Sequence, residues 1–275
     1  MLETNTASCG GFPGLSDSFT AALWAIGYGL QMAYANFTRA MFHVGGQSDY
    51  YNPFTPPLTN QSTFHQWTIG PVYYSSLFVA EALGSSNQSQ VLDLQMNNDN
   101  EFTPGYAIYE NGQPTRVALI NFVDDNSGAS DYIASISIGG TVPSQVRVKY
   151  LLTSSVTRRY NITWAGQTFG DAFSSDGRPV GVVDVQTVDC DQTNNVCNVK
   201  VSAPGAALVF LSDQELAKSD EGPTTMKGVV DTLAGTGQGG GSSGTFGLTY
   251  ALSSVSALIA GALLVSHDYE MVIMA

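Results

Sequence analysis

Charged residues are scarce in this chain, and basic residues are the scarcest of them. Only 12% of the 275 residues are charged, which is about half of the usual share in soluble proteins. Ten Lys and Arg stand against 23 Asp and Glu, for a formal net charge of −13. Because so few cations cannot form the basic stripe that neutralises phosphates, the composition argues against a nucleic-acid-binding protein.

Cysteine and histidine are also rare, with three of each in the chain. Cys190 and Cys197 bracket the turn-like stretch DQTNNV, a spacing that a disulfide-tied hairpin tolerates. Zinc is a poor alternative, because no histidine lies near them and two thiolates alone do not complete its coordination. The sequence therefore predicts a disulfide, and it points to no metal and no cofactor.

What is abundant is uncharged and polar: Ser, Thr, Asn, Gln, Gly and Tyr. This composition suits an extracellular protein that handles carbohydrate, although an ordinary acidic soluble protein fits it equally well. Four N-x-S/T sequons fall at expected turns or strand edges. Together with the expected disulfide they favour the secretory pathway. The sequon residues are Asn36, Asn60, Asn87 and Asn161.

Two helices and a strand are expected near the start of the chain. In residues 16–33 apolar side chains recur at three- and four-residue spacing, which predicts a helix with Ser16 as its N-cap. Pro71 begins a second helix, which ends at Gly84. Between them, the apolar run 39–46 ends in glycines and predicts a buried strand.

Short alternating segments take over between residues 90 and 212, separated by Gly, Pro, Asn and Asp turns. This pattern is typical of an antiparallel β-sandwich. Asn111-Gly112 is the sequence of a tight hairpin turn. The expected strands cover residues 106–110, 116–122, 132–138, 145–152, 158–164, 180–188, 196–203 and 206–211.

The last 63 residues change character again. Residues 213–244 are a polar spacer that runs into a flexible Gly/Ser-rich linker. Residues 245–265 carry no charge and are long enough to cross a bilayer as a helix. The hydrophobic tail 245–275 is interpreted as a glycolipid-anchor signal. Charged residues follow the apolar run, however, so a retained transmembrane helix or a misread gene end stays open.

Three stretches resemble glycoside hydrolase family 79, the β-glucuronidase and heparanase-like enzymes. They are ETNTASCGGFPGLSDSFTAALWA, FHVGGQSDYYNPFTPP and WTIGPVYYSSLFVAEALG. The resemblance extends over roughly residues 2–212. It implies a chain that is mainly β with an α/β remnant: the last two βα units of a (β/α)8 barrel in residues 1–86, then an antiparallel β-sandwich in residues 87–212. Residues 39–46 would be the eighth barrel strand.

The same resemblance assigns site residues. Glu3 matches the family's catalytic nucleophile, at the end of the seventh barrel strand. Cys9 and Gly10 match the backbone amides that hold the carboxylate of glucuronic acid, and Tyr50 or Tyr51 matches the tyrosine that assists them. Amides suffice, because N–H groups that converge on a carboxylate form charge-assisted bonds without a cation. The expected ligand is a glycan that bears glucuronic acid.

Several other residues have two interpretations. Trp67, Tyr73 and Tyr74 are candidates to stack on sugar rings, but we expect them to form a hydrophobic seam between the barrel remnant and the sandwich. His43 is expected in the core or behind the site, rather than lining it. Cys9 is not expected to act as a catalytic thiol, since no histidine stands in a recognisable arrangement with it.

The functional expectation follows from the family's chemistry. A retaining glycosidase needs a second carboxyl group as acid/base, which the resemblance places on a fourth barrel strand that no part of this chain matches. We therefore expect the C-terminal part of a secreted, surface-anchored retaining β-glucuronidase-like hydrolase, inactive as this chain, with its two helices docked imperfectly. The alternative is a non-catalytic, surface-anchored β-sandwich of a cell wall or an adhesion protein.

Overall fold

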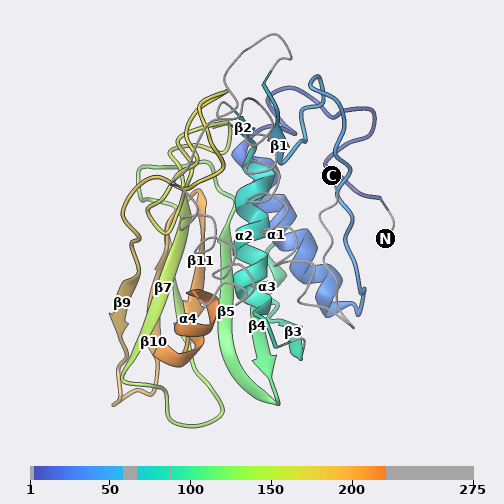
Figure 1. Ribbon diagram of the computed structural model, residues 1–275. Helices are drawn as coiled ribbons and strands as arrows, with labels where there is room; N and C mark the ends of the chain where they lie inside the picture. The colour runs from blue at the N-terminus through green and yellow to red at the C-terminus, as the bar shows by residue number, and fades with distance from the viewer. Residues whose placement is uncertain (1–2, 58–66, 87, 221–275) are drawn as a thin grey trace, which may run out of the picture.

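The computed structural model describes residues 3–57, 67–86 and 88–220 (Figure 1). The expected hydrophobic tail, most of the expected linker, and the sequon residues Asn60 and Asn87 lie outside these ranges. Within the described residues, no helix is both long enough and apolar enough to span a membrane.

One antiparallel sheet of seven strands forms the centre of the molecule. Its strands are β3 (Ser89–Asp93), β4 (Gly105–Glu110), β5 (Gln113–Asn121), β7 (Gln145–Leu152), β8 (Thr163–Trp164), β9 (Gln186–Asp189) and β11 (Gly205–Phe210). They lie in the order β3-β4-β5-β11-β7-β8, and β9 also pairs with β7. A second, two-stranded sheet consists of β6 (Tyr132–Ile136) and β10 (Cys197–Val201).

The central sheet is covered on both faces. Two helices, α1 (Phe19–Tyr34) and α2 (Pro71–Leu83), lie side by side against one face (Figure 1). Alternate residues of β11 show the two layers: Leu208 packs in the cluster that contains the helices, and Val209 packs with β6 and β10. A strand that is buried on both faces needs apolar side chains throughout, and every residue of β11 is buried.

The helices share the core of the sheet instead of docking on it imperfectly. Phe19, Ile26 and Phe78 are fully buried in one cluster with residues of β4, β5, β7 and β11. Tyr73 and Tyr74 pack edge-on against Phe169, at 5.1 and 5.4 Å between ring centres. The seam expected from the aromatic residues is therefore confirmed, and the expectation of imperfect docking is wrong.

The start of α1 differs from the expectation. Its N-cap is Ser18, whose side chain makes no capping hydrogen bond, whereas the Ser16 hydroxyl accepts from the Phe12 amide at 2.9 Å. The first amides of the helix donate instead to backbone carbonyls of the sandwich: Phe19 to Arg158 at 2.7 Å, and Thr20 to Val156 at 2.9 Å. The donors that every helix leaves open at its start are thus satisfied by the neighbouring layer.

Residues that favour turns account for one strand prediction that the structure confirms and for one that it shortens. Asn111 and Gly112 adopt left-handed backbone, with φ of 52° and 75°, and connect β4 to β5 as expected. The expected strand 158–164 shrinks to β8, because Asn161 turns the chain at a φ of 58°.

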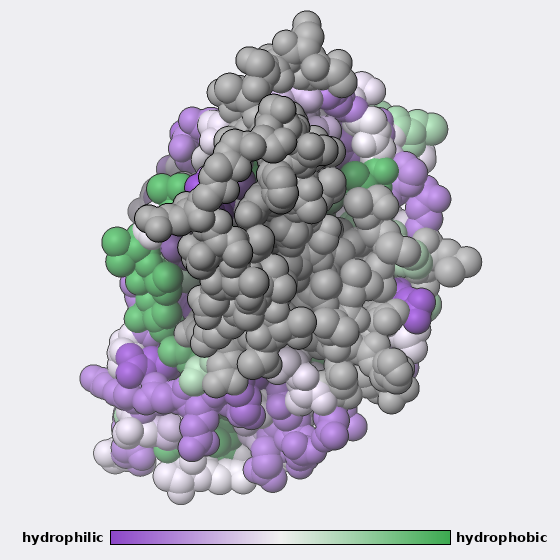
Figure 2. All heavy atoms as spheres, in the orientation of Figure 1, coloured by the Kyte–Doolittle hydropathy of each residue, from purple (hydrophilic) through white to green (hydrophobic). Residues whose placement is uncertain are grey.

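In the segment 180–188, the alternation of apolar and polar residues predicted a longer strand than the structure has. Three valines suggested a strand there, yet Val180, Val182 and Val183 are 66%, 86% and 53% exposed, and pairing with β7 begins only at Gln186. Gly181, at a φ of 117°, breaks the extended run. Figure 2 shows apolar atoms along the left edge of the molecule, the side on which β9 lies in Figure 1.

Several elements lack a counterpart in the sequence predictions. Strand β3 extends the sheet beyond β4, and the short helix α3 (Met96–Asp99) follows it. A two-stranded pair, β1 (Phe54–Thr55) and β2 (Thr68–Ile69), lies ahead of α2. Helix α4 (Asp213–Asp220) occupies the start of the expected polar spacer.

Helix α4 is held by a buried ion-pair network. Arg116, which is fully buried, contacts Glu110 at 2.6 Å and Glu215 of α4 at 2.8 Å. The expectation that residues from 213 onward form only a spacer is therefore wrong for the first eight of them.

A second set of polar contacts connects α2 to the sheet. Glu81 of α2 accepts hydrogen bonds from Lys149 and from the Trp164 indole, each at 2.8 Å.

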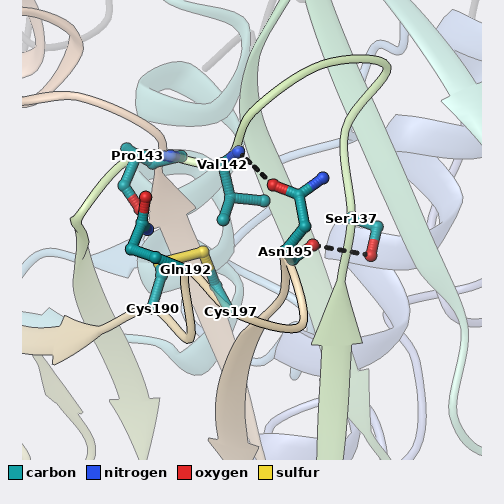
Figure 3. Close-up of a disulfide and its surroundings, with 7 residues drawn as sticks. All are labelled: Ser137, Val142, Pro143, Cys190, Gln192, Asn195 and Cys197. Atoms are coloured by element: carbon teal, nitrogen blue, oxygen red, sulfur yellow. Dashed lines mark hydrogen bonds between the residues drawn. A yellow bond between two sulfur atoms is a disulfide. The ribbon is translucent and has the colours of Figure 1, made fainter.

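The expected disulfide between Cys190 and Cys197 is confirmed (Figure 3). It closes the turn that leads into β10, and Asn195 of that turn joins the neighbouring loop. The Asn195 side chain accepts from the Val142 amide at 2.8 Å, and its carbonyl accepts from Ser137 at 3.3 Å. The disulfide closes the turn, and the two hydrogen bonds of Asn195 hold it against the 137–143 loop.

We expect Phe78→Ala to destabilise the whole described unit by about 3–5 kcal/mol, because the change empties a site at the centre of the shared core. The Phe78 ring lies 5.2 Å from the Trp164 ring, between helix and sheet. The control is Phe102→Ala, at a site that is 54% exposed, with an expected change within about 0.5 kcal/mol. Urea unfolding followed by circular dichroism measures both, and a separate, earlier loss of helix signal would contradict a shared core.

Candidate active site

Two segments that are far apart in the sequence meet at a parallel bridge between Thr4 and Phe42. The Thr4 amide donates to the Met41 carbonyl at 2.8 Å, and the His43 amide donates to the Thr4 carbonyl at 3.2 Å. The strand expected over 39–46 is reduced to this single bridge. A strand is stable only as part of a ladder, and the glycines at the end of the run weaken it further.

The bridge brings Glu3 next to His43. The Glu3 carboxylate lies 3.7 Å from His43 Nδ1, and the two side chains are 74% and 44% exposed. The imidazole also meets the Tyr51 ring edge-on, at 5.8 Å between ring centres. A polar contact as exposed as this one contributes little stability, so its effect here is on orientation. His43 is therefore not a core residue, whereas its position beside Glu3 fits the expected place behind the site.

The Asp49 side chain lies between the loop after Glu3 and the loop after His43. It lies so close to Gly10 that a Cβ there would come 2.5 Å from the carboxylate, and a Cβ on Gly45 would overlap it. Gly10 has a φ of 87°, a conformation that side chains disfavour. Its carbonyl also accepts from the Tyr50 amide at 2.7 Å. The two loops can pack this closely only because glycines occupy these positions.

The two candidate tyrosines differ in burial and in hydrogen bonding. Tyr51 is 5% exposed and its hydroxyl accepts from the Gly10 amide at 3.2 Å, whereas Tyr50 is 41% exposed. Burial raises the pKa of Tyr51, and the nearby charges of Asp49 and Glu3 raise it further. The phenol is therefore neutral, and because it accepts from Gly10 it keeps its own proton for a ligand. The Gly10 amide, by contrast, is already engaged.

Asn52 shapes the same loop and has no counterpart in the sequence predictions. Its amide group donates to the Gly46 carbonyl at 2.8 Å and accepts from the Gly45 amide at 2.9 Å. The side chain is only 5% exposed. An asparagine that follows a glycine pair by six or seven residues is the signal that could have identified it, because Asn readily bonds nearby backbone.

The remaining predicted site residues are not part of this cluster, or lie only at its rim. Cys9 is a free, exposed cysteine with a φ of 56°. Asn36 and Asn161 are exposed, with φ of 61° and 58°. In residues 3–57, 67–86 and 88–220, no group of three or more His, Cys, Asp and Glu side chains is arranged to hold a metal ion.

A comparison with known protein families identifies the middle part of the chain. Residues 105–208 match the family described as "Glycosyl hydrolase family 79 C-terminal beta domain". The chain contains a family 79 beta domain. The matched residues begin with β4 and extend into β11, so the family 79 beta domain includes most of the central sheet and the disulfide.

Two relatives that match most of the chain agree with this assignment. A beta-glucuronidase from Aspergillus niger is 30% identical over 224 residues, which cover 76% of this chain and 40% of that protein. One from Neurospora crassa is 29% identical over 216 residues, covering 66% of this chain and 38% of the relative. The chain is thus distantly homologous to fungal beta-glucuronidases, and it spans about two fifths of their length.

A solved structure shares the fold beyond the family 79 beta domain. It is the 4-O-alpha-L-rhamnosyl-beta-D-glucuronidase from Fusarium oxysporum, in a Rha-GlcA complex, with a TM-score of 0.60 and 23% identity. The similarity covers 76% of this chain and 42% of the Fusarium chain. Because 76% exceeds the share that residues 105–208 represent, the common fold includes part of the chain outside the beta domain.

We expect Tyr51→Phe to lower the free energy of unfolding by about 1–3 kcal/mol, because it leaves the buried Gly10 amide without its acceptor. Tyr50→Phe removes the same atom from an exposed side chain, and should change the stability by less than about 0.5 kcal/mol. Chemical denaturation of both variants measures the difference. Equal effects of the two substitutions would show that the Tyr51 hydroxyl does not join the loops.

Proposed function

We propose that this chain is the nucleophile-bearing part of a retaining β-glucuronidase-like glycoside hydrolase that acts on glycans bearing glucuronic acid. Residues 1–86 would be the last two βα units of a (β/α)8 barrel, packed on the family 79 beta domain. Helix α1 connects two segments that bridge in parallel, as a βαβ unit requires. Enzymes of this architecture carry their catalytic residues where barrel strands end.

The placement of Glu3 carries the proposal. The carboxylate is accessible, stands beside the bridge residue Thr4, and faces His43 at 3.7 Å. A retaining mechanism needs such a group to attack the anomeric carbon and form a glycosyl-enzyme ester. His43 would orient it, since a partner at one oxygen leaves the other free for attack. The proposal assigns the acid/base role to no residue of this chain.

Tyr51 would recognise the substrate's carboxylate. Its neutral hydroxyl keeps a proton to donate, and a hydrogen bond to an ionised oxygen is about twice as strong as one between neutral groups. The Fusarium relative is a glucuronidase in a complex with a disaccharide of rhamnose and glucuronic acid, which supports the same substrate class here. Because Gly10 already donates to Tyr51, the tyrosine takes over the role that the family resemblance gave to the amide.

The nucleophile can be tested without an acid/base. A 2-deoxy-2-fluoro-β-glucuronyl fluoride has a leaving group that departs without protonation, so attack by Glu3 should trap a covalent ester on the full chain. We expect mass spectrometry to locate one added sugar on the peptide that contains Glu3, and Glu3→Gln to abolish it. Glu101→Gln, at an exposed glutamate of the sandwich side, should leave the labelling unchanged.

Two outcomes would contradict this assignment. Labelling of Asp49 would show that the nucleophile is misidentified, although the glucuronide site exists. Absence of any label at saturating reagent would overturn the catalytic proposal and favour the alternative, a non-catalytic surface module built on the family 79 beta domain.

We propose that the protein passes through the secretory pathway to the cell surface. The disulfide and the exposed sequon residues Asn36 and Asn161 support this, because both features are typical of secreted proteins. Attachment to the membrane through the residues after 220 stays a prediction.

Secretory expression should glycosylate the two exposed sequons. We expect Asn36→Gln and Asn161→Gln each to reduce the protein's mass by one N-glycan, because each removes one acceptor. Asn198→Gln, which changes an exposed asparagine outside any sequon, should leave the mass of attached glycan unchanged. Mass spectrometry before and after enzymatic deglycosylation measures this, and carbohydrate on neither Asn36 nor Asn161 would contradict the proposed compartment.

A further inference from the structure

A cleft of about 440 Å³ lies where the end of α1 meets β3, the terminal strand of the central sheet. Its volume is within the range of about 300–1,000 Å³ that small-molecule sites occupy. It is lined by residues of α1, β3 and β4, together with Asn36. Among the described residues, those that line it are all different from those that cluster around Glu3. The cleft is therefore a separate candidate for a ligand.

The backbone of Asn36 is fixed by the way in which α1 ends. The Asn36 amide donates to the Ala33 carbonyl at 3.1 Å, and the Phe37 amide donates to the Met32 carbonyl at 2.9 Å. These two bonds commonly end a helix on one left-handed residue, and Asn36 has a φ of 61°. Asparagine tolerates this conformation better than most residues do. The helix end therefore holds the base of the Asn36 side chain at the cleft.

Asn36 is also the acceptor of a sequon, with Thr38 as the hydroxyl residue. Both residues are exposed, and N-glycans are attached at the protein surface. Because the acceptor residue lines the cleft, the first sugar of a glycan on Asn36 would be held next to it. A covalent link of this kind gives the sugar a high effective concentration at the cleft. Contacts too weak to bind a free sugar are therefore enough to hold an attached one.

The cleft suits N-acetylglucosamine, the neutral sugar that begins an N-glycan. None of the described residues that line it is charged. Tyr34, two residues before the acceptor, lines the cleft and is 43% exposed. Its ring offers an apolar face with a hydroxyl at the edge, which matches the C–H face and the hydroxyls of a pyranose. Gln90 of β3 also lines the cleft, and its amide group can both donate to and accept from the acetamido group.

The strand beside the cleft lies at the edge of the sheet. β3 pairs with β4 and is the last strand in the order of the central sheet. A terminal strand presents backbone groups that can pair with another chain, and natural proteins blunt or cover such edges. Leu92 of β3 and Leu94 just after it are 44% and 38% exposed. A bulky hydrophilic group on Asn36 would cover this edge without burying a charge.

We propose that the first sugar of an N-glycan on Asn36 packs in this cleft against Tyr34 and covers the edge strand β3. The glycan is then part of the folded structure, and its role is to complete the surface where α1 ends. The inference rests on the proposed passage through the secretory pathway, and it is independent of the glucuronide site.

The stability of the secreted full chain tests the contact with Tyr34. Thr38→Ala removes the glycan and leaves Asn36 in place, and we expect it to lower the ratio of folded to unfolded protein about two- to tenfold, the size of one ring contact. In a Tyr34→Ala background the same change should have no effect, because the double-mutant cycle isolates that contact. In Phe102→Ala, at an exposed ring elsewhere, the loss should persist. Trimming with an endoglycosidase that leaves only the first sugar should retain the full stability. Urea unfolding measures each ratio.

Hydrogen exchange tests the cover of β3 without any change at Tyr34. The amides of β3 should exchange about two- to tenfold faster in Thr38→Ala than in the glycosylated wild type, because local opening no longer loses the sugar contact. Asn161→Asp removes the other exposed acceptor, which lies outside the residues that line the cleft, and it should leave exchange in β3 unchanged.

Four results would overturn the inference and leave the proposed compartment intact. They are carbohydrate on Asn161 but not on Asn36, an effect of Thr38→Ala that is equal with and without Tyr34, stability that falls when only the first sugar is left, and exchange in β3 that is the same with and without the glycan. Carbohydrate on neither Asn36 nor Asn161 would overturn both proposals.

Discussion

The start of α1 is the point on which the rest of the structure depends. This helix has no side-chain cap of its own, and the carbonyls of Arg158 and Val156 accept its first two amides. Open donors at a buried helix end are costly, so α1 and the sandwich loop that caps it require each other. Because α1 also lies between the bridge residues Thr4 and Phe42, the position of Glu3 depends on that cap.

Polar contacts between the helices and the sheet determine how the two layers are aligned, and contribute less to the stability of their packing. Hydrophobic burial supplies the attraction, through the shared cluster of both helices and the sheet. Glu81 adds direction, since it bonds both Lys149 and the Trp164 indole. Buried charges are costly unless all partners are present, so a helix shifted by one turn would cost Lys149 its hydrogen bond to Glu81.

The sandwich is thus part of the candidate site's construction. Its loop at Arg159 and Tyr160 belongs to the segment that caps α1, and the same two residues line a cleft together with Asp49 and Tyr50. One short stretch of chain therefore both caps α1 and lines the cleft beside Asp49.

The sequence by itself determined the two helices, the Asn111-Gly112 hairpin, the disulfide and the family, because each depends on local periodicity, turn chemistry or a contiguous motif. Only the tertiary structure decided that His43 faces Glu3, that Tyr51 rather than Tyr50 meets Gly10, and that the exposed valine run before Gln186 stays outside the sheet. These outcomes depend on which distant segment supplies a partner, and no local pattern encodes that choice. The start of α1 is the clearest case. The sequence pattern indicated Ser16 as the N-cap, but the first amides of the helix donate to carbonyls about 140 residues away in the chain.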